Sequence, residues 1–380
     1  MQLLSPNALS DSLKLTFSRL ICLKSTIKWV FLSASLSGSF AQGQTADSLL
    51  EHQAQAVIDT PSDRETLIFY QGKSEQLDKF RQALEIQLKL KMPQSTFNFV
   101  DLTSLSKRDL EERFANTASC AMAIGPYATQ KMLSVRKNIN HFSVLASRNL
   151  LDKLHRVYAR LGIKVSGIYE EQPFYRQIFL SKALAPGLEE IGLLLNQKDK
   201  YYLSEYQSIA EQHGLTLNYR ILNASDSPEK YLADVADQEN YLLLTNNSQL
   251  FMKSKLAAMV LTAYYQQVKL IGNRYQDAEV GTLASIYTPS TTLAIEASNE
   301  FKLACEQSEL AKPRYAESFS VIINKQIAEN LNMGNINTNQ LSKSVTQLEN
   351  QWLETSNSET LEAQLQREKR TTMRQVESGR

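Results

Sequence analysis

The sequence is poor in the residues that bind metals. Its 380 residues include only four histidines and three cysteines, and neither set has the CxxC or HExxH spacing of a metal site. The motifs GxSxG, GxxxxGK[ST] and GxGxxG are absent too, which argues against a nucleophile-elbow hydrolase, a P-loop and a dinucleotide site. We therefore expect no metal, no cofactor and no enzymatic activity.

The chain also lacks an excess of charge of either sign, with 41 basic and 40 acidic residues. Nucleic acids and anionic membranes attract basic surfaces, so we expect neither as a partner. The composition, 43% hydrophobic and 21% charged, is that of a globular protein. At roughly 100–200 residues per domain, the length predicts two units that each bury a core.

The first 41 residues have the pattern of a secretory signal peptide. Residues 1–28 carry four basic residues and one acidic residue, and 29–41 read WVFLSASLSGSFA, with Ser39 and Ala41 at the −3 and −1 positions of a cleavage site. This apolar stretch is shorter than the roughly 20 residues that span a bilayer. The alternative is a buried helix of the fold. We expect an exported mature chain that begins near Gln42.

Two cysteines, Cys120 and Cys305, remain after removal of this segment. An oxidising compartment would allow them to form a disulfide. Cys120, however, lies in the apolar run CAMAIG, where a buried free thiol is the simpler expectation.

The rest of the chain alternates short apolar runs with amphipathic stretches, in two series. The strand-like runs cover 65–70, 96–100, 120–124, 142–146 and 165–169 in the first series, and 191–195, 215–222, 241–244, 268–272 and 283–287 in the second. Helical patterns separate them, the clearest at 150–160 and 202–213. Such apolar strands between helices are typical of parallel sheets covered on both faces. We expect an α/β protein with two doubly wound, Rossmann-like lobes.

Beyond residue 334 the chain becomes polar. Leu341, Val345, Leu348 and Trp352 have helical spacing, so a helix can dock there on the body of the protein. A partner-binding helix is the alternative. We expect the rest of 334–380 to be a solvated tail.

Polar residues follow most of the predicted strands. In open parallel sheets, ligands bind outside the carboxyl ends of the strands, where helix N-termini also offer free N–H groups. Side chains of this kind suit holding a small polar ligand, although capping a helix or facing solvent is the alternative for each of them. The candidate ligand-binding residues are Tyr127, Ala128, Ser147, Arg148, Asn196, Thr245, Asn246, Asn247, Asn273 and Arg274.

Four segments carry a resemblance to a known family. These are AIGPYATQ (123–130), VSGIYEEQPFYRQIFLSKALAPGLEEIGLLLN (165–196), YLLLTNN (241–247) and SVIINKQIAENLNM (320–333). In this order and spacing they resemble the substrate-binding proteins of ABC transporters, relatives of the tryptophan- and tyrosine-uptake binding proteins. The resemblance implies a type I periplasmic-binding fold, a ligand between the lobes and a permease partner.

Several residues depart from the family pattern. Asn246 stands at the usual aspartate, Pro126 at a threonine, and Lys73 near the usual His-Pro. Arg148 and Arg274 occupy positions where smaller residues are expected, and guanidinium groups favour an anionic ligand. The same arginines can instead fill the cleft.

These observations lead to one hypothesis and one rival. The first is a monomeric periplasmic binding protein with a multi-strand hinge near 168–174, 285–290 and 311–317. The rival is a periplasmic sensory or adaptor protein that signals to a membrane partner, through the tail at 334–380. In both, the domains are a signal peptide at 1–41, lobe 1 at 62–170 plus about 288–312, lobe 2 at 171–287 plus about 314–333, and the tail.

Overall fold

The computed structural model describes residues 65–115, 117–135, 137–236, 241–245, 253–307, 310–334 and 336–355. The predicted signal peptide, Asn246, Asn247 and the end of the polar tail lie outside the described residues. Within these ranges, no helix is long and apolar enough to cross a membrane.

The first sheet is parallel and has the strand order β2-β1-β3-β4-β5. We call this sheet with its helices lobe 1. Its elements are β1 (Glu65–Tyr70), α2 (Glu75–Lys91), β2 (Phe97–Asp101), α3 (Lys107–Ala115), β3 (Thr117–Ile124), α4 (Pro126–Ser134), β4 (Asn140–Ala146), α5 (Arg148–Ala159) and β5 (Val165–Tyr169).

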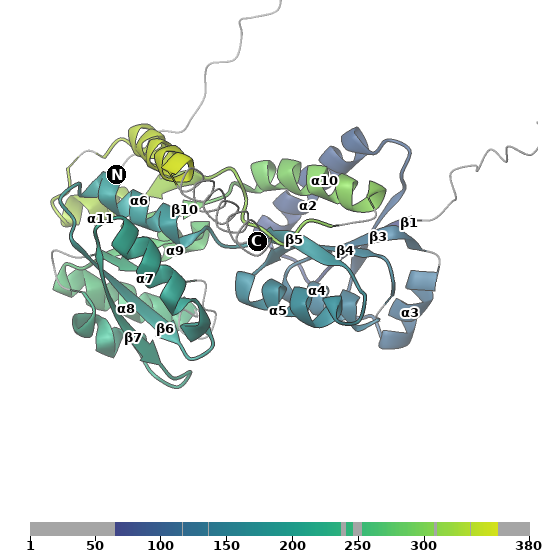
Figure 1. Ribbon diagram of the computed structural model, residues 1–380, viewed down its shortest axis with the longest axis horizontal. Helices are drawn as coiled ribbons and strands as arrows, with labels where there is room; N and C mark the ends of the chain where they lie inside the picture. Colours follow the sequence, from purple (N-terminus) through teal and green to yellow (C-terminus); the bar gives the residue numbers. More distant parts are fainter. Residues whose placement is uncertain are drawn as a thin grey trace, which may run out of the picture. The chain divides into compact units, whose positions relative to one another are not determined.

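A helix from much later in the chain, α10 (Ser290–Glu306), completes lobe 1. It lies with α2 on one face of the sheet, while α4 and α5 cover the other face (Figure 1). Leu84 of α2 and Phe301 of α10 are fully buried in one cluster with Met122 and Phe142 of the sheet. Burial on both faces explains why these strands are continuous apolar runs.

The second sheet has the order β11-β10-β9-β8-β6-β7 and is parallel except for the β10–β11 pair. We call this sheet with its helices lobe 2. Its strands are β6 (Glu190–Asn196), β7 (Thr216–Leu222), β8 (Tyr241–Leu243), β9 (Lys269–Gly272), β10 (Ala284–Tyr287) and β11 (Ser320–Ile323). Its helices are α6 (Phe174–Leu184), η1 (Asp199–Tyr202), α7 (Leu203–Gln212), η2 (Pro228–Asp234), α8 (Lys253–Gln266), α9 (Tyr275–Val280) and α11 (Lys325–Asn330). The predicted fold, two doubly wound α/β lobes, is confirmed.

The chain passes between the two sheets three times: at 170–173 between β5 and α6, at 288–289 between β10 and α10, and before β11. The third segment runs beside the edge strand β5. There Arg314 donates its N–H to the Gly167 carbonyl at 3.0 Å, and Tyr169 donates to the Arg314 carbonyl at 2.9 Å. The hinge therefore extends the sheet of lobe 1.

Side chains join the three crossing segments. Gln172 of the first donates Nε2–H to Thr288 Oγ1 of the second at 2.6 Å. The Thr288 hydroxyl in turn donates to the Ser318 carbonyl of the third at 3.0 Å. Two hydrogen bonds therefore connect the three crossings.

A disulfide joins Cys120 of β3 to Cys305 of α10, with the two Cα atoms 5.1 Å apart. The simpler expectation of a buried free thiol was therefore wrong. Burial and bonding occur together because α10 packs on the sheet directly over β3. Asn140 of β4 strengthens the same junction by donating to the carbonyls of Ala304 at 2.6 Å and Gln307 at 2.9 Å.

A C-terminal helix over 338–355 docks on lobe 2. Leu341 and Val345 belong to the buried core of this lobe, and Leu348 and Trp352 pack against it. The predicted apolar stripe is therefore confirmed as a docking face.

Candidate functional site

Two sequence-predicted residues, Thr245 and Asn273, lie at the same edge of the lobe 2 sheet. They follow β8 and β9, which pair in parallel with Leu243 opposite Ile271. The buried side chain of Gln177 from α6 donates to the carbonyls of Leu244 at 3.0 Å and Ile271 at 3.1 Å. Gln177 thus holds the two strand ends together beneath Thr245 and Asn273.

Both residues carry a buried oxygen without a hydrogen-bond partner among the described residues. Thr245 is 8% exposed and Asn273 is 3% exposed, and the atoms concerned are Thr245 Oγ1 and Asn273 Oδ1. Buried polar atoms in native proteins are nearly always paired, because an unmet one costs about 1–3 kcal/mol. Two such oxygens lie at adjacent strand ends and could accept hydrogen bonds from a ligand; ligand contacts of Thr245 and Asn273 stay a prediction.

Asp277 of α9 organises the loop after β9. Its Oδ2 accepts the N–H groups of Asn273 at 3.1 Å and Arg274 at 3.2 Å, and its Oδ1 accepts Arg274 Nη2–H at 2.8 Å. Burial acts to lower the pKa of Arg274, but the neighbouring Asp277 carboxylate outweighs it and the pKa is raised. Arg274 is therefore a fixed cation bound to its own helix.

Three other predicted residues have local structural partners. The Ser147 hydroxyl accepts the Leu150 N–H and caps α5. Asn196 Oδ1 accepts N–H groups of the following turn, from Lys198 at 2.7 Å and Asp199 at 2.9 Å. Ala128 is 1% exposed in the core of lobe 1. Ligand contacts of these three stay a prediction.

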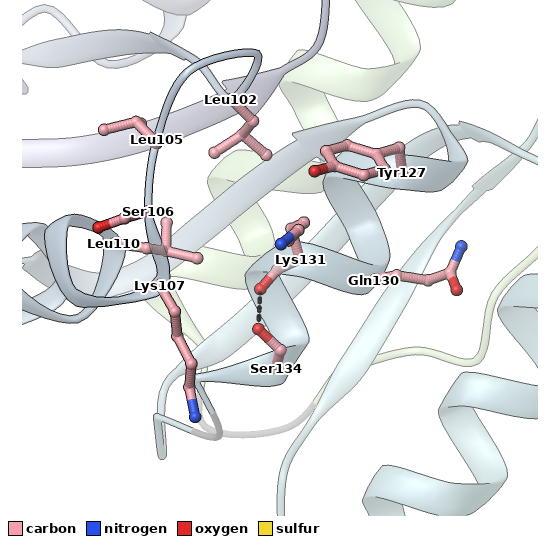
Figure 2. A pocket seen from close by; sticks show the side chains of 9 residues that line it. All are labelled: Leu102, Leu105, Ser106, Lys107, Leu110, Tyr127, Gln130, Lys131 and Ser134. Atoms are coloured by element: carbon pink, nitrogen blue, oxygen red, sulfur yellow. Dashed lines mark hydrogen bonds between the residues drawn. The ribbon is translucent and has the colours of Figure 1, made fainter.

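Tyr127 lines a groove that belongs to lobe 1 alone. The groove has a volume of about 440 Å³ and lies between the start of α3 and helix α4 (Figure 2). Leu102 and Leu110 form its apolar wall, and the Lys131 ammonium lies 5.7 Å from the centre of the Tyr127 ring. The lining residues come from one lobe, so this groove does not join Tyr127 to Thr245 or Asn273.

Arg148, at the start of α5, reaches from lobe 1 to lobe 2. Its guanidinium donates to both carboxylate oxygens of Glu205 in α7, at 2.7 and 2.8 Å, and to the Tyr315 hydroxyl of the hinge at 3.0 Å. Burial acts to lower the pKa of Arg148, but the hydrogen bonds with Glu205 outweigh it and the pKa is raised. Sequence reasoning missed Glu205 and Tyr315, because neither follows a strand.

Arg176 of α6 was also missed, and it binds the hinge to the C-terminal helix. Its guanidinium donates to Glu349 at 3.0 Å, to Gln172 Oε1 at 2.7 Å, and to the carbonyls of Ala316 at 2.8 Å and Glu317 at 2.7 Å. Arg176 is 4% exposed and Glu349 is 6% exposed, so this is a buried ion pair with its hydrogen bonds met. The only sequence signal was the place of Arg176 within the 165–196 resemblance.

Comparison with known proteins assigns the chain to a family. The family described as ABC transporter substrate binding protein matches residues 109–347, more than half of the 380 residues. A search of curated proteins found no match.

Three solved structures have a similar fold. The first is a conserved domain protein from Vibrio cholerae (19% identity, 71% of this chain and 95% of that chain covered, TM-score 0.51). The second is the ABC domain from Streptococcus pneumonia in complex with L-Trp (18% identity, 73% and 98% covered, TM-score 0.52). The third is a ligand-free, open substrate-binding protein with adhesive properties from Clostridium difficile (15% identity, 72% and 96% covered, TM-score 0.56). At these identities they bear on the fold alone. By the family match, the chain belongs to the ABC transporter substrate-binding proteins, which bind solutes.

Proposed function

We propose that this chain is the exported solute-binding component of an ABC-type uptake system and that it holds a small polar ligand between its lobes. The observation that carries the proposal is the pair of buried oxygens at adjacent strand ends, Thr245 Oγ1 and Asn273 Oδ1, which have no hydrogen-bond partner in the part of the chain that the structure describes. Carboxyl ends of parallel strands are the usual ligand sites of such sheets.

The two side chains indicate what the ligand presents. A threonine hydroxyl both donates and accepts, whereas an asparagine amide oxygen only accepts. A hydroxyl, amide or ammonium group of the ligand would meet both requirements. Gln177 keeps the two oxygens in register by bridging the strand ends.

The Cys120–Cys305 disulfide supports an exported protein. Disulfides persist in oxidising compartments and are rare in the cytosol. Together with the signal-peptide pattern of residues 1–41, it favours the periplasm. The permease of the same system would then be the protein partner, and closure about the linked hinge would be the state presented to it.

Thermal unfolding of residues 42–380 in the presence of amino acids, aromatic acids, nucleosides and small anions tests the proposal. A ligand at 100 times its dissociation constant adds about 2.7 kcal/mol of stability, which is several degrees in Tm. The rise in Tm that the ligand causes must be smaller in Asn273→Ala, because this variant lacks one of the two proposed ligand-binding oxygens. If no compound shifts a protein that unfolds cooperatively, the binding role is contradicted.

A sensory or adaptor role is the second candidate. It is favoured by the Arg176–Glu349 pair, which links the hinge to the C-terminal helix and so to the chain beyond it. Crosslinking in intact cells distinguishes the two roles. Capture of a permease supports uptake, whereas capture of a sensor kinase or a cyclase supports signalling.

A further inference from the structure

The contact between Arg148 and Glu205 has the geometry of a bound carboxylate ligand. Two parallel hydrogen bonds, 2.7 and 2.8 Å long, join the guanidinium to the two carboxylate oxygens. This bidentate arrangement is the one by which arginine recognises free carboxylates. Here the carboxylate belongs to the other lobe of the same chain.

Further residues of α5 and of η1, the short helix that precedes α7, reinforce the contact. Asn149 of α5 donates to Asp199 Oδ1 of η1 at 3.0 Å. The Arg148 guanidinium also lies 4.4 Å from the centre of the Tyr202 ring, and the Tyr202 hydroxyl donates to Asp152 at 3.4 Å. The first turn of α5 and the η1–α7 segment thus form one continuous polar contact between the lobes.

The charges around Arg148 are already compensated. Asp152 lies 3.4 Å from its Nε, Glu205 takes both Nη groups, and Glu171 accepts its backbone N–H at 2.9 Å. Two carboxylates, those of Asp152 and Glu205, therefore face the guanidinium, and the carboxylate of Glu171 lies at the backbone of the same residue. A further anion would meet their repulsion and would have to displace Glu205.

We propose that Glu205 is an internal carboxylate for Arg148, which holds the lobes together in the ligand-free protein and excludes anionic ligands from this arginine. The transported solute is then neutral or cationic where it approaches Arg148. This statement about the solute rests on the proposed function, whereas the contact between the lobes is measured without any ligand.

The strength of the Arg148–Glu205 contact determines how far its loss shifts the protein towards an open form. Arg148 is 20% and Glu205 is 42% exposed in their side chains, so solvent screens the pair in part. Exposed ion pairs contribute little to stability, and bidentate pairs contribute more. Loss of the Glu205 charge should therefore change the ratio of closed to open protein about 3- to 10-fold. A free carboxylate must compete with Glu205 for Arg148, so removing Glu205 should tighten the binding of a free carboxylate by a factor of the same size.

The first experiment measures the distance between the lobes. Spin labels go on two exposed sites, as Leu90→Cys in α2 of lobe 1 and Tyr265→Cys in α8 of lobe 2. The ligand-free protein should show mainly the shorter distance, and Glu205→Gln should move population to a longer one. The matched control is Asp234→Ala, which breaks the Arg220–Asp234 pair within lobe 2 and should leave the distance unchanged.

The second experiment tests the carboxylate site with acetate, followed by NMR titration. Glu205→Ala should bind acetate about 3- to 10-fold more tightly than the unchanged protein, and adding Arg148→Gln should abolish that gain. Equal distances in Glu205→Gln and the unchanged protein, or equal acetate binding with and without Glu205, would overturn the proposal. If no compound raises Tm but Glu205→Gln does lengthen the distance between the lobes, the result contradicts the proposed function and leaves the role of Glu205 supported.

Discussion

Replacing Thr245 by valine separates a ligand-binding hydroxyl from a structural one. Valine keeps the branched shape and removes the hydroxyl, which has no hydrogen-bond partner among the described residues. Removing an unmet buried polar group is neutral or stabilising, whereas removing a bonded one is costly. The ligand-free protein should therefore gain stability, and ligand binding should weaken.

The magnitudes follow from burial. An unmet buried polar group costs about 1–3 kcal/mol, and because Thr245 keeps 8% exposure we expect a gain near the lower limit, about 1 kcal/mol. That is a rise of roughly 1–2 °C in Tm for a chain of this size. Losing one hydrogen bond to the ligand, at most about 1.5 kcal/mol, should weaken binding about tenfold.

Differential scanning calorimetry with and without ligand measures both effects. Thr282→Val is the matched control, because the Thr282 hydroxyl is fully buried in lobe 2 and bonds to Ser285 Oγ at 2.9 Å and the Ala284 carbonyl at 3.2 Å. It should lower Tm. If Thr245→Val lowers Tm as much as the control and leaves the ligand shift intact, Thr245 is a structural residue and the reasoning is refuted.

Three further perturbations concern stability. Replacing Cys120 and Cys305 by serine opens a loop with a sequence separation of 185, which should lower the free energy of unfolding in urea by about 3–5 kcal/mol. The unchanged protein, once its disulfide is reduced, should unfold at the same urea concentration as the double serine variant. Glu349→Ala leaves the buried Arg176 without its carboxylate and should cost about 3 kcal/mol, more than the double change Arg176→Met with Glu349→Leu. Burial raises the pKa of Tyr241 to about 12, so the unfolded state loses this proton first and stability should fall between pH 10 and 12, with a smaller slope in Tyr241→Phe.

The sequence was a good guide to the strands and a poor one to what lies beside them. The predicted runs 65–70 and 165–169 match β1 and β5, because strands buried on both faces are apolar throughout. The disulfide partner of Cys120 could not be identified from the sequence in this way. Its bond depends on the return of α10 to lobe 1 after a whole second lobe, which no local pattern records.

The same limit applies to the candidate site. Topology alone predicts that Thr245 and Asn273 share a sheet edge, since both follow parallel strands. Periodicity can identify which face of α7 is apolar, but it cannot reveal that Glu205 meets an arginine of the other lobe. Contacts between lobes depend on how two independent units approach each other, and a single sequence does not encode that in any short window.

The discontinuous construction of lobe 1 also governs the order in which this protein can fold. Its strands emerge early during synthesis, yet α10, which covers one face of them together with α2, ends at residue 306. Until then, α2 alone covers that face, and Phe142 lacks its contact with Phe301 of α10. Lobe 2 likewise waits for β11 and for Val345 of the C-terminal helix. Neither unit can close its core early, so the chain should stay unfolded, and able to pass through a narrow channel, for most of its length.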